Sequence, residues 1–170
     1  MPPRGPRVAV DAILVERGKL LVVSRGRDPF RGQPALPGGR VELGERAEEA
    51  VLREVLEETG LKVRIASLVG VYSDPGRDPR GHTISIAYAV ARMGGVPKAG
   101  TDAAAVQWVD LSRLPRLAFD HSQIVSDFVA RAGTTGKLRV SSTRALSARE
   151  ASRSRRGARK RRRGGQAPVP

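Results

Sequence analysis

The chain contains no cysteine. Disulfide bridges, thiolate metal sites and a cysteine nucleophile are therefore excluded. Aromatic residues make up only 4% of the 170 residues, and long apolar runs are missing. The longest apolar stretches, such as ISIAYAVA, are too short to span a bilayer, and MPPRGPRVAV at the N-terminus lacks the apolar segment of a signal peptide. We therefore expect no membrane contact and a cytoplasmic location.

Acidic residues are scarce overall, with 17 Asp and Glu against 31 Lys and Arg. The imbalance lies at the C-terminus, where residues 134–170 hold twelve basic residues and one acidic residue, a charge of +11, which leaves +3 for residues 1–133. Residues 134–170 consist largely of Ser, Gly, Arg and Pro, a composition typical of disorder. We predict a folded domain over 1–133 and a dispensable tail over 134–170 that contacts polyanions non-specifically.

The remaining pattern predicts a mixed α/β sandwich with a mixed β-sheet. Runs rich in β-branched residues lie at 7–25 (with a turn at Arg17-Gly18-Lys19), 61–73, 82–92 and 104–111. Residues 46–59 have no Gly or Pro and predict a helix that Gly60 ends. A second helix is predicted over 119–133, with Asp120 or Ser122 as its N-cap and Gly133 as its stop.

The first predicted helix carries closely spaced carboxylates. Glu54, Glu57 and Glu58 lie at i, i+3 and i+4 and therefore share one face with Ala47 and Ala50. Like charges this close repel one another, and a cation between them would remove the repulsion. Oxygen-only ligands favour Mg²⁺. A solvated surface helix, a common arrangement for such residues, is the alternative that spacing alone leaves open.

The residues around these carboxylates resemble a known motif. Gly39, Glu45 and Arg53–Leu61 match the Nudix box at all of its defined positions. The resemblance implies the Nudix α/β/α sandwich and hydrolysis of a nucleoside diphosphate linked to another group. It also implies Glu54, Glu57 and Glu58 as metal ligands, with Mg²⁺ as cofactor and Mn²⁺ as a substitute.

Further roles follow from the same resemblance. Gly39 lets a loop approach the helix, and Glu45 and Gly60 mark the two ends of the helical part of the box. Arg53 belongs to the catalytic residues of the box, where its role is structural. It is expected to orient a carboxylate by a charge-assisted hydrogen bond. Gly38, beside Gly39, is expected to contact the substrate. Glu57 and Glu58 are expected to take part in catalysis.

A second stretch, VYSDPGRDPRGHTISIAY over 71–88, resembles the ADP-ribose pyrophosphatase group. The resemblance implies hydrolysis of ADP-ribose to AMP and ribose 5-phosphate. Arg77 and Arg80 are candidates for contacts with phosphate or ribose, with solvated loop residues as the alternative. Tyr72 and Phe119 are candidate stacking faces, with core packing as the alternative.

The catalytic base is left open between two positions. Between Glu58 and Glu150 the sequence holds no Glu, so a loop Glu beyond the box is excluded. One alternative is a box carboxylate, above all Glu57, that also binds metal. The other is Asp102, which is about one methylene shorter than a Glu and must approach closely or act through a water.

Other functions agree with parts of the sequence. A complete Nudix box also suits hydrolysis of a sugar nucleotide, a dinucleotide such as NADH, or an oxidised nucleoside triphosphate. Nudix-related regulators that sense ADP-ribose carry a similar DPxRDPRG segment, followed by a winged-helix domain. The complete box, and the mere 37 residues after Gly133, favour an enzyme over a regulator. We also expect a homodimer, since members of the group often pair.

Overall fold

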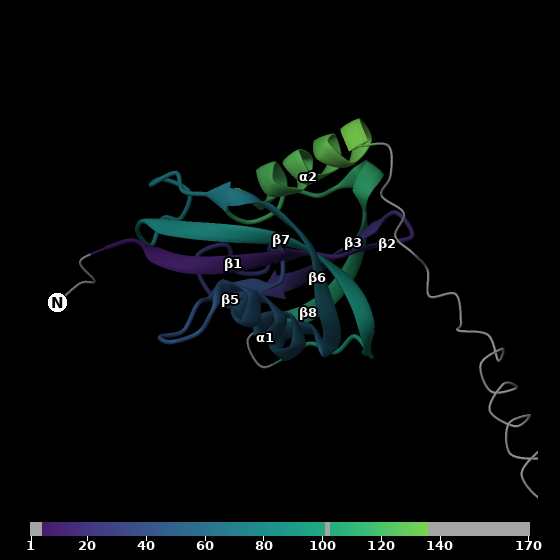
Figure 1. Ribbon diagram of the computed structural model, residues 1–170, viewed down its shortest axis with the longest axis horizontal. Coiled ribbons are helices and arrows are strands. Elements are labelled where there is room, and N and C mark those ends of the chain that lie inside the picture. Colours follow the sequence, from purple (N-terminus) through teal and green to yellow (C-terminus); the bar gives the residue numbers. More distant parts are fainter. Residues whose placement is uncertain (1–4, 101–102, 136–170) are drawn as a thin grey trace, which may run out of the picture. The chain divides into compact units, whose positions relative to one another are not determined.

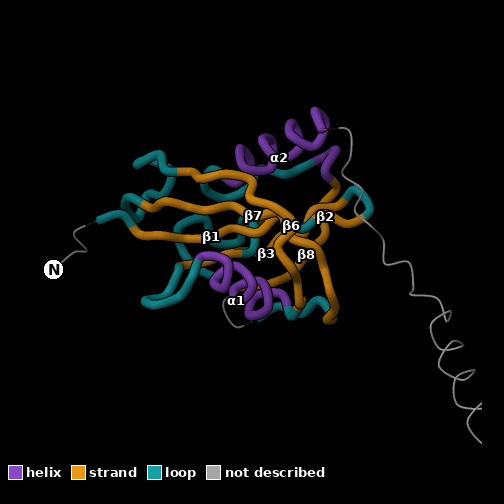
Figure 2. Tube along the Cα trace, in the orientation of Figure 1, coloured by secondary structure: helices purple, strands orange, loops and turns teal. Residues whose placement is uncertain are grey.

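The computed structural model describes residues 5–100 and 103–135. Its strands are β1 (Arg7–Ile13), β2 (Val15–Glu16), β3 (Lys19–Arg25), β4 (Pro34–Ala35), β5 (Gly38–Arg40), β6 (Leu61–Tyr72), β7 (Thr83–Gly95) and β8 (Ala103–Asp110). Its helices are α1 (Ala47–Thr59), the 3₁₀ turn η1 (Leu111–Arg113) and α2 (His121–Thr135). Figure 1 and Figure 2 show α1 and α2 on opposite sides of the strands. None of the described helices is long and apolar enough to cross a membrane.

The strands form two small sheets. The first has the order β5-β1-β7-β6, and within it β1 and β7 are parallel while the other neighbours are antiparallel. The second joins β2, β3 and β4, and β8 pairs antiparallel with β3. The predicted fold class, an α/β sandwich with a mixed sheet, is confirmed.

Alternation along β1 decides which helix each side chain meets. Val10 and Ala12 pack in one buried cluster with Val51 and Val55 of α1. Ile13 packs in another buried cluster with Ile124 of α2. Because successive strand residues point to opposite faces, β1 holds both helices against one sheet.

The predicted boundaries of the first helix and of the first hairpin are confirmed. Arg17 and Gly18 both have positive φ, 50° and 76°, and form the two-residue turn between β2 and β3. Gly60 ends α1 in the left-handed conformation at φ 70°, and its N–H donates to the Leu56 carbonyl at 2.9 Å. Glycine suits this position because it adopts positive φ without steric cost.

One prediction for the last helix is wrong. Helix α2 continues through Gly133 to Thr135, because glycine permits the left-handed conformation that ends a helix but does not require it. Asp120 directly precedes α2, as expected of its N-cap, and its carboxylate accepts two hydrogen bonds from Arg77. The alternative cap, Ser122, accepts instead from the N–H of Leu117, ahead of the helix.

The predicted tail falls largely on residues 136–170, which lie outside the described residues. Its dispensability and its contact with polyanions therefore stay predictions, as does the homodimer.

We predict that Leu61→Ala destabilises the domain by about 2–5 kcal/mol, because Leu61 is 0% exposed and truncation leaves a cavity. Leu68→Ala is the matched control on the same strand, since Leu68 is 56% exposed, and should change stability by less than about 0.5 kcal/mol. Urea unfolding followed by circular dichroism measures both. Equal losses in the two variants would contradict the placement of β6 against the core.

Candidate active site

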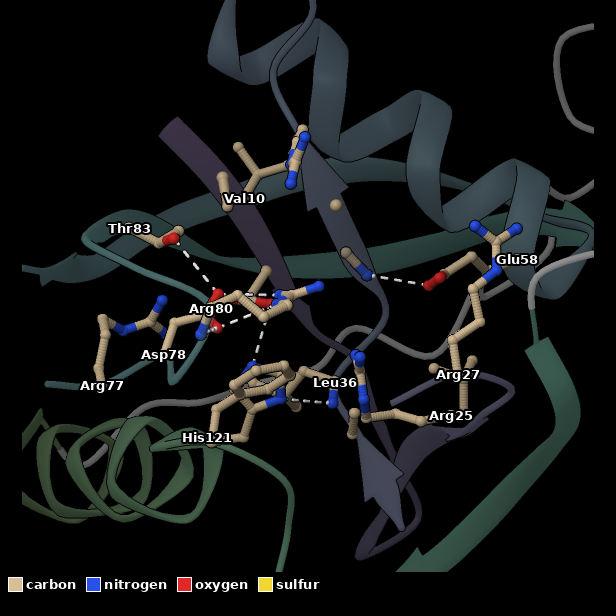
Figure 3. A pocket seen from close by; sticks show the side chains of 18 of the residues that line it. Val10, Arg25, Arg27, Leu36, Glu58, Arg77, Asp78, Arg80, Thr83 and His121 are labelled. Atoms are coloured by element: carbon tan, nitrogen blue, oxygen red, sulfur yellow. Dashed lines mark hydrogen bonds and ion pairs between the residues drawn. The ribbon is translucent and has the colours of Figure 1, made fainter. Parts of the chain in front are cut away.

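A cavity of about 200 Å³ lies where the end of α1, the start of α2 and the loop between β6 and β7 meet β1, β3 and β5. Figure 3 shows Glu58 at one side of it and Asp78, Arg80 and His121 at the other. Many of its lining residues are charged, namely Arg7, Arg25, Arg27, Arg40, Arg77, Arg80, Asp11, Glu58 and Asp78. The basic members outnumber the acidic ones, so the cavity suits an anionic ligand.

Glu58 brings the acidic face of α1 into the cavity. Its carboxylate accepts the Gly38 N–H at 3.0 Å. Burial raises the pKa of Glu58 to about 7, and the nearby carboxylates of Glu54 and Asp11 act in the same direction. A carboxylate with such a pKa can take up or release a proton near neutral pH.

Glycine is required where β5 meets α1. A Cβ on Gly39 would lie 2.2 Å from Oε1 of Glu54, and a Cβ on Gly38 would lie 2.1 Å from the Val10 carbonyl oxygen. A larger residue at Gly38 would push β5 away from the backbone of β1, and one at Gly39 would displace the Glu54 carboxylate. The two glycines therefore allow β5 to lie between β1 and the carboxylates of α1. This agrees with the expectation that Gly39 lets the chain approach the helix.

Arg53 gathers the other carboxylates of the motif. Its guanidinium donates to Glu45 at 2.8 and 3.0 Å, to Glu54 at 2.9 Å and to Glu57 at 3.3 Å. It also donates to the Arg40 carbonyl at 3.0 Å, which ties α1 to β5. Hydrogen bonds from Arg53 hold the pKa of Glu45 at about 2. One guanidinium faces three carboxylates, so this face of α1 keeps a negative charge.

The carboxylates of Glu54, Glu57 and Glu58 do not converge on one point. Arg53 holds Glu54 and Glu57, the latter 59% exposed, while Glu58 turns toward Gly38. Within residues 5–100 and 103–135, no three acidic or histidine side chains are grouped closely enough to hold a metal ion. A cation bound by Glu54 and Glu57 must therefore compete with Arg53 for their oxygens.

Arg77 is a buried part of the cavity wall rather than a solvated loop residue. Its side chain is 4% exposed, and it donates to both oxygens of Asp120, at 2.8 and 2.5 Å. Its Nη2 also lies 3.8 Å from Asp11. Arg77 thereby fixes the loop after β6 to the start of α2 and to β1.

Arg80 lies on the cavity side of the same loop. It donates to Asp78 from Nε at 3.0 Å and from Nη2 at 2.8 Å, and Asp78 is only 3% exposed. The pair gives the loop a fixed shape, while the Arg80 side chain remains 43% exposed at the opening. The Arg80 guanidinium can therefore meet a ligand without being displaced from Asp78.

An aromatic ring supports two of the arginines. The guanidinium carbon of Arg25 lies 4.6 Å from the ring centroid of Phe119, and that of Arg80 lies 5.2 Å from it. The Phe30 ring meets Phe119 edge-on, with centroids 4.9 Å apart. Phe119 thus holds two cations at the cavity by cation–π contacts. Its expected role in stacking on a nucleobase is not tested.

The sequence reasoning missed Arg25, Asp11 and His121. Asp11 gave a usable signal, because it is the one acidic residue in the apolar stretch VAVDAILV, and it is 6% exposed at the cavity. A charge inside a buried strand is costly without partners and therefore points to a site. Arg25 ends β3 and gave no such signal.

One predicted site residue, Tyr72, lies elsewhere. Tyr72 lines a separate surface hollow with Val71, Asp74 and Gln123, and its hydroxyl donates to Asp127 at 3.0 Å. It is not among the residues that line the cavity beside Glu58. Asp102 lies outside the described residues.

Comparisons with known proteins agree with this arrangement. The model of the NUDIX domain matches residues 5–128. An ADP-ribose pyrophosphatase of Methanocaldococcus jannaschii is 53% identical over 124 residues, which is 73% of each chain.

Solved structures show the same fold. The NUDIX domain of Shewanella oneidensis NrtR, complexed with ADP ribose, has a TM-score of 0.67 and 26% identity over 76% of this chain and 90% of that one. A Francisella tularensis bifunctional NMN adenylyltransferase/ADP ribose pyrophosphatase, complexed with AMP and a Mn ion, has a TM-score of 0.70 and 29% identity over 78% of this chain and 44% of that one. The box, the fold and the family model together place this chain in the NUDIX family, as a Nudix pyrophosphohydrolase.

Proposed function

We propose that this chain hydrolyses the diphosphate linkage of ADP-ribose to AMP and ribose 5-phosphate with the help of a divalent cation. The observation that carries the proposal is one cavity in which Glu58 faces Arg25 and Arg80 (Figure 3). A diphosphate can contact the arginines while a cation joins it to the carboxylates. The choice of ADP-ribose is supported by the archaeal relative and by the ADP ribose complex of similar fold.

Glu54, Glu57 and Glu58 would hold the cation, and their chemistry fits it. All three offer carboxylate oxygens, which suit Mg²⁺ and also Mn²⁺, and the Francisella neighbour was solved with a Mn ion. Burial among other carboxylates raises the pKa of Glu58 to about 7, a cost that a bound cation would offset. Arg53 neutralises only part of the charge of the carboxylates that it contacts.

The protein's own groups would prepare the substrate for hydrolysis. When bound, the divalent cation would neutralise charge on the diphosphate and lower the pKa of a water. Arg25 and Arg80 would hold the phosphate oxygens, because both guanidiniums lie against Phe119 at the cavity. Gly38 and Gly39 also line the cavity, so a substrate there would meet the backbone of β5.

Glu58 is the box carboxylate that we propose to accept the proton of the attacking water. It lines the cavity, and Glu57 does not. From that place its carboxylate can reach a water held beside the substrate. Glu58 thus replaces Glu57 as the box carboxylate that we propose as the base, and Asp102 stays the alternative.

We predict that Glu58→Gln lowers turnover by about 10²- to 10⁴-fold at saturating Mg²⁺, because the variant keeps its shape but loses the base and a metal ligand. Glu57→Gln should weaken Mg²⁺ binding. Glu48→Gln is the control, since Glu48 is exposed on the same helix. Near-normal turnover in Glu58→Gln, together with a thousandfold loss in Asp102→Asn, would move the base to Asp102.

ADP-ribose should give the highest kcat/KM of a panel that also contains NADH, a sugar nucleotide, diadenosine polyphosphates and deoxynucleoside triphosphates. Phosphate released from the products by a coupled phosphatase measures the rates. A higher kcat/KM for a deoxynucleoside triphosphate or NADH would reject the substrate assignment. Tight ADP-ribose binding without hydrolysis would instead favour a sensor.

The metal-free protein should become less stable as the pH rises from about 4.5 to about 7. The pKa of Glu58 is about 7 in the folded chain against an ordinary value of 4.5, so the folded state binds this proton more tightly. The stabilisation is complete below pH 4.5 and is lost as the pH rises through 7. Urea unfolding in EDTA should therefore show Glu58→Gln gaining stability over the wild type at pH 8 but not at pH 4.5. An equal difference at both pH values would contradict the raised pKa.

A further inference from the structure

The segment from Pro34 to Gly38 is fixed from both sides by groups far away in sequence. The Pro34 carbonyl accepts the Ala118 N–H at 2.8 Å, just ahead of α2. The Leu36 N–H donates to Nδ1 of His121 at 2.9 Å, and the Gly38 N–H donates to Glu58 of α1 at 3.0 Å. Figure 3 shows both of the last two bonds, with the backbone running between them.

This segment has little freedom to move alone. Pro37 has no N–H, so Leu36 and Gly38 supply the amide donors around it, and the Pro37 carbonyl accepts from Ala12 of β1 at 2.8 Å. A Cβ on Gly38 would lie 2.1 Å from Val10 and 2.8 Å from Oδ1 of Asp11, so the backbone lies directly on β1. A shift at Leu36 would therefore be passed on to Gly38.

His121 is itself held in one state. Because Nδ1 accepts a backbone N–H, the ring is neutral and carries its proton on Nε2. Nε2 lies 3.4 Å from Oδ1 of Asp11, and the Ser85 hydroxyl donates to Oδ2 of the same carboxylate. His121 is 5% exposed, and burial lowers its pKa, which agrees with a neutral ring.

From these contacts we propose that His121 is a positioning residue for Glu58. It holds the Leu36 amide, which sets the place of the Gly38 amide two residues later, and that amide orients the Glu58 carboxylate. The start of α2 thereby determines how the acidic helix presents its carboxylate to the cavity, although His121 does not contact the proposed cation. The expected effect on metal binding rests on the proposed role of Glu58 as a ligand.

Three substitutions at His121 separate its two bonds. His121→Asn places an amide oxygen near the position of Nδ1 and keeps the acceptor for Leu36. His121→Gln places its amide near Nε2 and keeps only the contact with Asp11. His121→Phe keeps a ring and loses both. His82→Phe is the matched control, because His82 is the only other histidine of the chain and is exposed.

The test measures amide hydrogen exchange of Leu36 and Gly38 by NMR and Mn²⁺ affinity by calorimetry, besides kcat and KM. In His121→Phe and His121→Gln we expect Gly38 exchange about tenfold faster, and Mn²⁺ affinity and kcat about 10- to 100-fold lower, with KM changing less. His121→Asn should stay within about threefold of the wild type on each measure. His82→Phe should match the wild type.

The outcomes distinguish the two proposals. Unchanged Gly38 exchange in both His121→Phe and His121→Gln would overturn the positioning role, as would an equal loss in His121→Asn, which would indicate ring packing alone. Faster Gly38 exchange with unchanged Mn²⁺ affinity would support the connection from His121 to Gly38. The unchanged Mn²⁺ affinity in that case would count against Glu58 as a metal ligand, and so against the proposed function.

Discussion

The arrangement of the site depends on the close approach of β5 to α1. Gly38 and Gly39 have no space for a Cβ, and the carboxylates of Glu54 and Glu58 lie directly against them. Arg53 reinforces the approach by joining α1 to the Arg40 carbonyl. If this contact opened, the acidic face of α1 would lose its place at the cavity, because the Gly38 amide would no longer hold Glu58.

The second constraint is charge. Buried charged groups are tolerated only when they are paired and hydrogen-bonded, and the cavity obeys this rule through Arg77 with Asp120 and Arg80 with Asp78. The first pair buries Arg77 in the cavity wall, and the second leaves Arg80 exposed at the opening. Glu58, in contrast, has a backbone amide as partner, and its pKa is raised by burial and then by neighbouring carboxylates. The cavity thus has a basic side and an acidic side that suits a cation.

Strand β1 packs against both helices. Its alternate residues face α1 and α2, and Asp11 among them faces His121 and Arg77. One strand therefore carries core residues for both helices and a charged group for the cavity. The same strand pairs with β5 and with β7, so a displacement of either neighbour reaches the site.

Local sequence by itself determined the helix over Ala47–Thr59, its end at Gly60 and the hairpin at Arg17-Gly18, because propensity and positive φ act over a few residues. The spacing of Glu54, Glu57 and Glu58 also placed the acidic face, and the box identified the family. Only the tertiary structure decided that Arg77 pairs with Asp120, that Arg25 and Arg80 meet at Phe119, and that His121 holds Leu36. His121 and Leu36 are 85 residues apart, and no local preference reports a contact that forms only when the start of α2 meets the segment between β4 and β5.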